Sequence, residues 1–108
     1  EKDSPLFEQH LHEVTKQLTE NLSKLQIGLA ADYIYDQFWH WYCDLQLENY
    51  KQGQLSYRQL LAGLIVFLKL LHPFLPFVTE AVWQQLVKKK LVTEPLLMLS
   101  TWPQVTVV

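Results

Sequence analysis

The two residues with the most obvious chemical potential in this sequence are His40 and Cys43. They are three positions apart, so on a helix the imidazole and the thiol would lie on the same side. Nucleophilic catalysis by a thiol also needs a group that orients the base and donors that hold an oxyanion. The surrounding sequence supplies neither, and we therefore interpret Cys43 as a buried structural residue.

The remaining polar residues do not form a pattern typical of a metal or phosphate site. His10 and His12 are two positions apart and His72 is isolated, whereas zinc ligands come in tighter groups of Cys and His. There is no glycine-rich phosphate loop and no Gly-x-Ser-x-Gly elbow. We expect Glu80 to cap its helix or to pair with Arg58 or a lysine. We predict no catalytic residue, no cofactor and no metal site within this chain.

The composition indicates one compact helical domain over residues 1–108. Of the 108 residues, 49% are hydrophobic and only three are glycine, which suits a single sizeable core. Nine basic and eleven acidic residues give a net charge of −2, so any contact with RNA would have to be local. Lys69 and His72 interrupt the apolar stretch 60–83, so we expect a core helix there and no membrane partner.

The cysteine count and the start of the sequence bear on location. One cysteine excludes an internal disulfide and fits a reducing compartment. Residues 1–4 are charged and polar with no apolar segment behind them, so no secretory signal is predicted. The sequence lacks an initiator methionine. We expect a cytoplasmic protein and a chain that is part of a longer one.

The spacing of apolar residues predicts an all-α fold, an antiparallel four-helix bundle with an extended C-terminal segment. Ser4 followed by Pro5 marks the first helix start, Gly28 is expected to cap the second helix, and Ser56 with Gln59 fits a capping box. The predicted helices cover residues 7–25, 29–48, 57 to 71 or 72, and 76–88, with a loop over 49–55 that carries Lys51 and an extended segment over 91–108.

Apolar side chains at steps of three and four define the faces expected to pack. The second helix has more aromatic rings than one core accepts, so some must meet a helix boundary, a neighbouring domain or a ligand. The residues expected to pack are Phe7, Leu11, Val14, Leu18, Leu22 and Leu25; Ala30, Ile34, Phe38, Trp41 and Leu45; Phe77, Val82, Trp83 and Leu86; and Leu96, Leu97, Met98, Leu99 and Trp102.

Three segments together resemble the anticodon-binding helical bundle of class I aminoacyl-tRNA synthetases of the valyl, isoleucyl and leucyl group. Residues 71–83, LHPFLPFVTEAVW, are most similar to the valyl form. Residues 35–44, YDQFWHWYCD, resemble the aromatic second helix of that bundle, and residues 98–103, MLSTWP, resemble the element that closes it. The resemblance spans roughly residues 5–103.

The resemblance implies a division of labour between two domains. In that family a Rossmann-type catalytic domain activates the amino acid with ATP, and the bundle grips the anticodon stem and loop of the tRNA. Neither catalytic signature, His-x-Gly-His or Lys-Met-Ser-Lys-Ser, occurs here. We therefore expect a fragment of a larger synthetase whose partners are tRNA, with valine tRNA first, and the catalytic domain of the same polypeptide. ATP and the amino acid would be used by that domain.

The sequence departs from the family at two places. The family's arginines near the start of the first helix are missing from residues 4–11, which leaves Phe7 and His10 as possible stacking groups there. Leu45 and Gln46 stand where the family often has Trp-Tyr. The isoleucyl and leucyl enzymes therefore remain alternatives.

Binding of an anticodon loop needs rings that stack on unpaired bases and cations that meet phosphates. The run 88–90 also has a structural explanation, because cations stabilise the negative end of a helix. A helical module that docks a partner protein through its aromatic helix is the alternative of another class. The candidate RNA-binding residues are Phe7, His10, Trp39 and Trp41 for stacking, and Lys16, Lys24, Lys51, Arg58, Lys88, Lys89 and Lys90 for phosphates.

Overall fold

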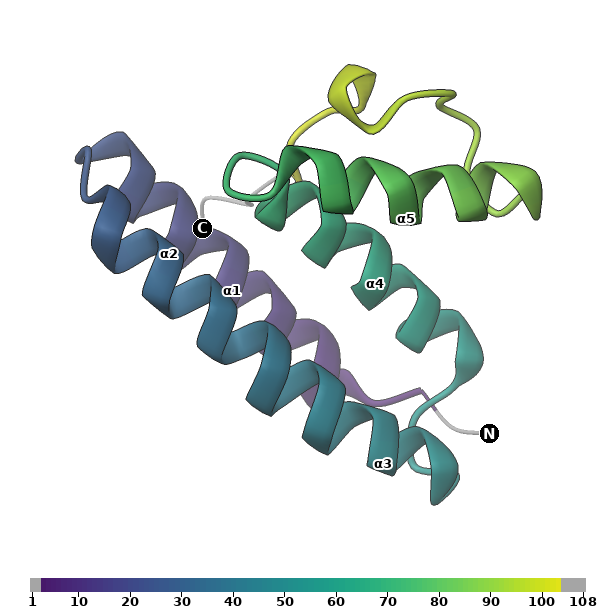
Figure 1. Cartoon of the computed structure of the whole chain (residues 1–108). Helices are drawn as coiled ribbons and strands as arrows, with labels where there is room; N and C mark the ends of the chain where they lie inside the picture. The colour runs from purple at the N-terminus through teal and green to yellow at the C-terminus, as the bar shows by residue number, and fades with distance from the viewer. Residues whose placement is uncertain (1–2, 104–108) are drawn as a thin grey trace.

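The computed structural model describes residues 3–103 (Figure 1). No strand occurs in this range, and the predicted all-α fold is confirmed. What we call the long helix is continuous through three parts, α2 (Ile27–Asp36), η1 (Gln37–Gln46) and α3 (Leu47–Lys51). The other elements are α1 (Pro5–Ser23), α4 (Tyr57–Leu71), α5 (Pro76–Lys88) and the short 3₁₀ turn η2 (Leu97–Leu99).

The helices pack in two groups. α1 and the long helix run antiparallel side by side, and α4 packs against both, while α5 packs on α4 (Figure 1). Buried side chains of α1, the long helix and α4 form one core group, which includes Phe67. A second group joins α4, α5 and η2 through Leu68, Trp83, Leu86 and Leu97. Among the described helices, none has both the length and the apolar character that crossing a membrane requires.

α1 begins where its sequence predicts. The Ser4 hydroxyl accepts a hydrogen bond from the Phe7 amide at 3.3 Å, and a proline is the first helical residue. The predicted apolar face is buried from Phe7 to Leu18. Leu25, expected on that face, is 81% exposed instead, because α1 ends at Ser23 and Leu25 adopts a φ of 60° in the turn that follows.

The middle of the long helix differs from the prediction. η1 is π-helical, so backbone bonds span five residues, as from the Leu47 amide to the Tyr42 carbonyl. The wider turn moves the buried stripe. Beyond Ile34 the buried positions are Tyr42 and Gln46, whereas Leu45, expected in the stripe, is 51% exposed.

The two ends of the long helix also correct the prediction. The helix begins at Ile27 with Gln26 at the cap position, so Gly28 lies inside the first turn and is not the cap. At the other end the helix includes Lys51, which was expected in a loop. Gly53 then adopts a φ of 79°, a left-handed conformation that favours glycine and lets the chain turn towards α4.

Only half of the predicted capping box is present at α4. The Ser56 hydroxyl accepts a hydrogen bond from the Gln59 amide at 3.2 Å, as predicted. The Gln59 side chain is buried and binds the backbone of Ser4 instead, accepting from its amide at 2.6 Å and donating to its carbonyl at 2.9 Å. This contact anchors the start of α1 to α4. α4 ends at Leu71, as predicted.

α5 has the predicted bounds, and Trp83 and Leu86 are buried as expected. Phe77 is a correction, because it was expected to pack and is 89% exposed. In that first turn the buried residue is Thr79 instead. Its hydroxyl lies 3.0 Å from Nδ1 of His72 at the end of α4.

Polar contacts tie the C-terminal segment to the bundle. Within residues 3–103, Glu80 neither caps α5 nor pairs with Arg58 or a lysine. Its carboxylate accepts hydrogen bonds from the first two amides of η2, at 2.8 and 3.3 Å. Leu97 is buried, and the Trp102 indole donates to the Thr19 hydroxyl at 3.0 Å. Three predicted anchors are exposed instead: Leu96, which precedes η2, and Met98 and Leu99 within it. The prediction for residues 104–108 lies outside the described residues.

Candidate nucleic-acid interface

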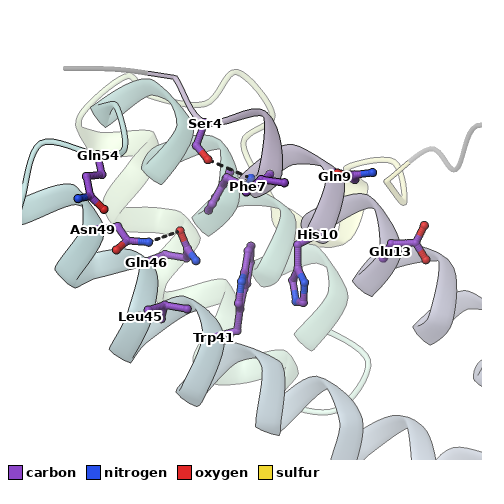
Figure 2. A pocket seen from close by; sticks show the side chains of 11 residues that line it. Ser4, Phe7, Gln9, His10, Glu13, Trp41, Leu45, Gln46, Asn49 and Gln54 are labelled. Atoms are coloured by element: carbon purple, nitrogen blue, oxygen red, sulfur yellow. Dashed lines mark hydrogen bonds between the residues drawn. The ribbon is translucent and has the colours of Figure 1, made fainter.

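An open groove of about 680 Å³ lies between the first turns of α1 and the last turns of the long helix (Figure 2). Residues four apart share one side of a helix, so Trp41, Leu45 and Asn49 of the long helix face the groove together. The groove is lined by Leu6, Phe7, Gln9, His10 and Glu13 of α1, by Trp41, Leu45, Gln46 and Asn49 of the long helix, and by Ser4 and Gln54 outside the helices.

Two stacked rings form one wall of this groove. The His10 and Trp41 rings are stacked with centroids 4.2 Å apart (Figure 2). His10 Nε2 also lies 2.7 Å from the Gln37 Oε1, within hydrogen-bond distance. Phe7 stacks on Trp41 at 5.2 Å from within the core. Contacts from two directions therefore fix the orientation of Trp41.

Phe7 and Trp39, two of the four predicted stacking residues, lie outside this wall. Phe7 is buried, so it supports Trp41 and offers no free face of its own. Trp39 is 54% exposed but is absent from the groove lining, because it projects from another side of the long helix. Of the four, the structure therefore brings together His10 and Trp41, both half-buried, in the groove lining.

Amide side chains border the groove on both sides. Gln9 and Gln54 are exposed, and Asn49 donates to Gln46 Oε1 at 3.3 Å (Figure 2). Amides both donate and accept hydrogen bonds, as the edges of unpaired bases require. No sequence pattern singles out these residues as a group, since they come from three separate segments. The one signal available in the sequence is the regular spacing of Trp41, Leu45 and Asn49, each four residues after the one before.

The groove itself carries little charge. Among the described residues that line it, only Glu13 is charged. Lys51 lies in the last turn of α3 and Arg58 in the first turn of α4, where Arg58 pairs with Asp3. The hydrogen bond from Ser56 and the Arg58 guanidinium hold the pKa of the Asp3 carboxyl below its ordinary value. Both cations are exposed, and neither lines the groove.

The other predicted cations are distributed over the surface. Lys24 follows α1, and Figure 1 shows that the turn joining α1 to α2 is at the opposite end of the helical pair from α3. Lys16 is exposed on α1, and the run 88–90 is exposed at the end of α5. None of these lysines lines the groove. Of the predicted residues, the structure brings His10 and Trp41 together in the groove lining, whereas Lys51 and Arg58, like the other lysines, lie outside it.

The histidine and cysteine pair does not form a reactive site in the described structure. His40 is exposed between Asp36 and Asp44, at 3.8 and 3.4 Å. Cys43 is half-buried, and burial followed by the charge of Asp44 raises the pKa of its thiol, which disfavours the nucleophilic thiolate. Within residues 3–103 no group of three or more His, Cys, Asp or Glu side chains is placed to hold a metal ion.

Comparison with known proteins identifies the family. The family model described as the anticodon-binding domain of tRNA ligase matches residues 6–107. The chain is 31% identical over 103 residues to a valine–tRNA ligase of Clostridium tetani, an alignment that covers 87% of this chain and 11% of that protein. It is 33% identical over 104 residues to a valine–tRNA ligase of Oceanobacillus iheyensis, covering 88% and 11%. It is 35% identical over 89 residues to one of Campylobacter jejuni, covering 82% and 10%.

This chain spans about a tenth of the length of these relatives. The family match nevertheless covers nearly the whole of the chain. It agrees with the all-helical architecture and includes the three sequence segments on which the resemblance rests. The chain belongs to the family of anticodon-binding domains of tRNA ligases.

Proposed function

We propose that this chain binds the anticodon stem and loop of valine tRNA, and that the groove between α1 and the long helix is the contact site. The observation that carries the proposal is the stacked pair of His10 and Trp41 beside a groove bordered by amides. Proteins read single-stranded RNA loops by stacking on splayed bases and by hydrogen bonds to the base edges. This wall and these amides supply both kinds of contact.

The direction of the RNA backbone follows from the charges. The Glu13 carboxylate in the groove repels phosphate, whereas two cations outside the groove attract it: Lys51, which shares α3 with the groove-lining Asn49, and Arg58 at the start of α4. The phosphates of the loop therefore pass Lys51 and Arg58, and the bases point towards His10. A net charge of −2 is compatible with this arrangement, because only a few local cations are needed.

The relatives support valine as the amino acid served, since the three named above are valine–tRNA ligases. We infer that the parent protein is a valine–tRNA ligase, with a catalytic domain in the same polypeptide that uses ATP and valine. The parent enzyme would act in the cytoplasm, where a lone cysteine stays reduced. An isoleucyl or leucyl enzyme is the runner-up that the tRNA titration below distinguishes.

The test is a titration of this chain with unmodified valine tRNA and with the same tRNA carrying a changed anticodon, at low and at physiological salt. We expect tighter, salt-sensitive binding to the valine anticodon. His10→Ala should weaken binding by about 1 to 3 kcal/mol, the range for one base stacked on a ring. Lys51→Gln should reduce the slope of log K against log salt by about 0.7, the share of one phosphate contact.

Matched control variants separate this site from general effects. His12→Ala removes another imidazole of α1 that does not line the groove, and Lys24→Gln removes the same charge at the opposite end of α1. Both should bind tRNA as the unchanged chain does. Equal binding to both anticodons, or equal weakening by His10→Ala and His12→Ala, would show that the groove does not read the anticodon.

A further inference from the structure

The long helix carries four rows of side chains, because residues four apart lie on the same face. The first row, from Ile34 to Gln46, packs into the core, and the second, from Gln37 to Asn49, faces α1 and the groove. The third row begins at Tyr35 and the fourth at Asp32. Exposed residues in these last two rows have no role in the proposed RNA site.

The third row is an apolar stripe that is only partly covered. We call it the Trp39 row, and it consists of Tyr35, Trp39, Cys43 and Leu47. Trp39 and Leu47 are exposed, and Tyr35 and Cys43 are half-buried. Trp39 makes one edge contact with Phe38 and belongs to neither core group. Exposed tryptophan within an apolar stripe is typical of the anchor residues of protein interfaces.

The fourth row is acidic and lies beside the Trp39 row. We call it the acidic row, and its four carboxylates, Asp32, Asp36, Asp44 and Glu48, are all exposed. All the Lys and Arg residues of the sequence lie outside positions 25–50, so no basic side chain of the long helix before Lys51 offsets these charges. His40 occupies the middle of the row, between Asp36 and Asp44. Negative charge therefore lies on both sides of His40 along one edge of the Trp39 row.

This charge decides what can cover the apolar stripe. RNA phosphates would be repelled by four exposed carboxylates beside Trp39. A positively charged partner would be attracted by them and oriented along the row. An amphipathic helix presents apolar residues at a spacing of three and four, which matches the four-residue step from Tyr35 to Leu47. Lysine or arginine beside its apolar face would then meet the acidic row.

We propose that the Trp39 row is a docking surface for a basic amphipathic helix of a partner protein, with Trp39 as its anchor. The surface lies on a different side of the long helix from the groove, so it does not depend on the proposed function. The helix inserts its apolar residues between Trp39 and Leu47, and its cations pair with Asp36 and Asp44.

The probe is a synthetic amphipathic peptide of leucine and lysine at helical spacing, labelled for fluorescence anisotropy and titrated with the chain. A peptide with glutamate in place of lysine is the matched control. We expect the lysine peptide to bind in a salt-sensitive manner and the glutamate peptide not to bind. Trp39→Ala should raise the Kd about 30-fold, the effect of losing an interface anchor. Leu47→Ser, in the same row, should also raise it.

Charge variants test the second half of the proposal. The pair Asp36→Asn with Asp44→Asn should raise the Kd and flatten its salt dependence. The pair Glu8→Gln with Glu20→Gln makes the same charge change on exposed positions of α1, and Phe77→Ala removes an exposed ring on α5. These controls should leave the Kd unchanged.

Three outcomes would overturn the proposal. One is equal weakening of peptide binding by Phe77→Ala and Trp39→Ala. Another is an unchanged Kd in both Trp39→Ala and Leu47→Ser while the circular dichroism of each variant stays that of a folded helical chain. The third is a loss of tRNA binding, but not of peptide binding, in Trp39→Ala, which would assign the row to RNA. Failure of the groove proposal is distinguishable, because it is measured with His10→Ala and tRNA.

Discussion

At the scale of single residues, Phe67 and Phe77 show how differently one residue type is used. Phe67 is 0% exposed and lies among the rings of Phe38, Trp41 and Tyr42, with centroids 5.2 to 6.1 Å away. Phe77 is 89% exposed in the first turn of α5. Aromatic pairs at these separations add to the free energy gained from burial. Phe67 therefore supports the helix that forms the groove, and Phe77 supports nothing within the described residues.

The same substitution at both positions measures this difference. Phe67→Ala should lower the free energy of unfolding by about 3 to 5 kcal/mol, because it empties a buried site and removes three ring contacts. Phe77→Ala should change it by no more than about 0.5 kcal/mol, as for an exposed residue. Urea denaturation followed by far-UV circular dichroism gives both values. Similar midpoints for the two variants would mean that Phe67 is not at the centre of the core.

At the scale of elements, the crossing of α4 over α1 and η1 depends on Gly63. A Cβ atom placed at Gly63 would lie 2.7 Å from the Phe7 Cζ and 2.8 Å from the Tyr42 Cε1, too close for two carbon atoms. Tyr42 also donates a hydrogen bond from its hydroxyl to the Leu60 carbonyl of α4. The absence of a side chain at Gly63 therefore sets how near the three helices approach.

Replacement of two helical glycines by alanine tests this close approach. Alanine is the better helix former by about 1 kcal/mol, so Gly28→Ala, with nothing within 4 Å of the new Cβ, should stabilise the chain slightly. Gly63→Ala should instead destabilise it by about 1 to 3 kcal/mol, because overpacking moves two aromatic rings. Thermal unfolding of both variants measures these two changes in stability. If Gly63→Ala stabilised the chain as Gly28→Ala does, the crossing would be looser than the structure has it.

At the scale of the whole molecule, Glu80 links the C-terminal segment to the helices. Burial acts to raise the pKa of Glu80, but hydrogen bonds from the Leu97 amide, the Gln84 side chain and the Met98 amide outweigh it, and the pKa lies below its ordinary value of 4.5. A carboxyl whose pKa is lowered by folding stabilises the fold above its unfolded pKa. That stabilisation is lost as the pH falls through the folded pKa.

The pH dependence of unfolding tests this link. The unchanged chain should lose stability as the pH falls from about 5 to about 3, and Glu80→Gln should lose less over that interval, because its side chain does not titrate. The two stability curves should therefore converge in acid. Glu20→Gln is the control, since among the described residues the Glu20 carboxylate makes no hydrogen bond. Curves for Glu80→Gln and the unchanged chain that stay parallel would contradict this role.

The sequence by itself determined the local features of this protein. The bounds of α4 and α5, the Ser4 and Ser56 caps and the all-α class follow from apolar spacing and capping chemistry, which act over a few residues. The resemblance carried by residues 71–83 is confirmed by the family match. For the RNA-binding site, the sequence indicated which residue types to consider, aromatic rings and cations. It did not show which of these residues lie near one another.

Only the tertiary structure decided which residues meet. The π-helical turns of η1 shift the buried stripe from Leu45 to Gln46. The side-chain amide of Gln59 binds the backbone of Ser4 instead of completing the capping box at the start of α4. The groove likewise joins segments that are distant in sequence. These choices depend on packing and hydrogen bonding between elements, whose energies outweigh local preference. No pattern within one helix contains that information, because the partner of Gln59 is Ser4, 55 residues away, and the groove is lined from both α1 and the long helix.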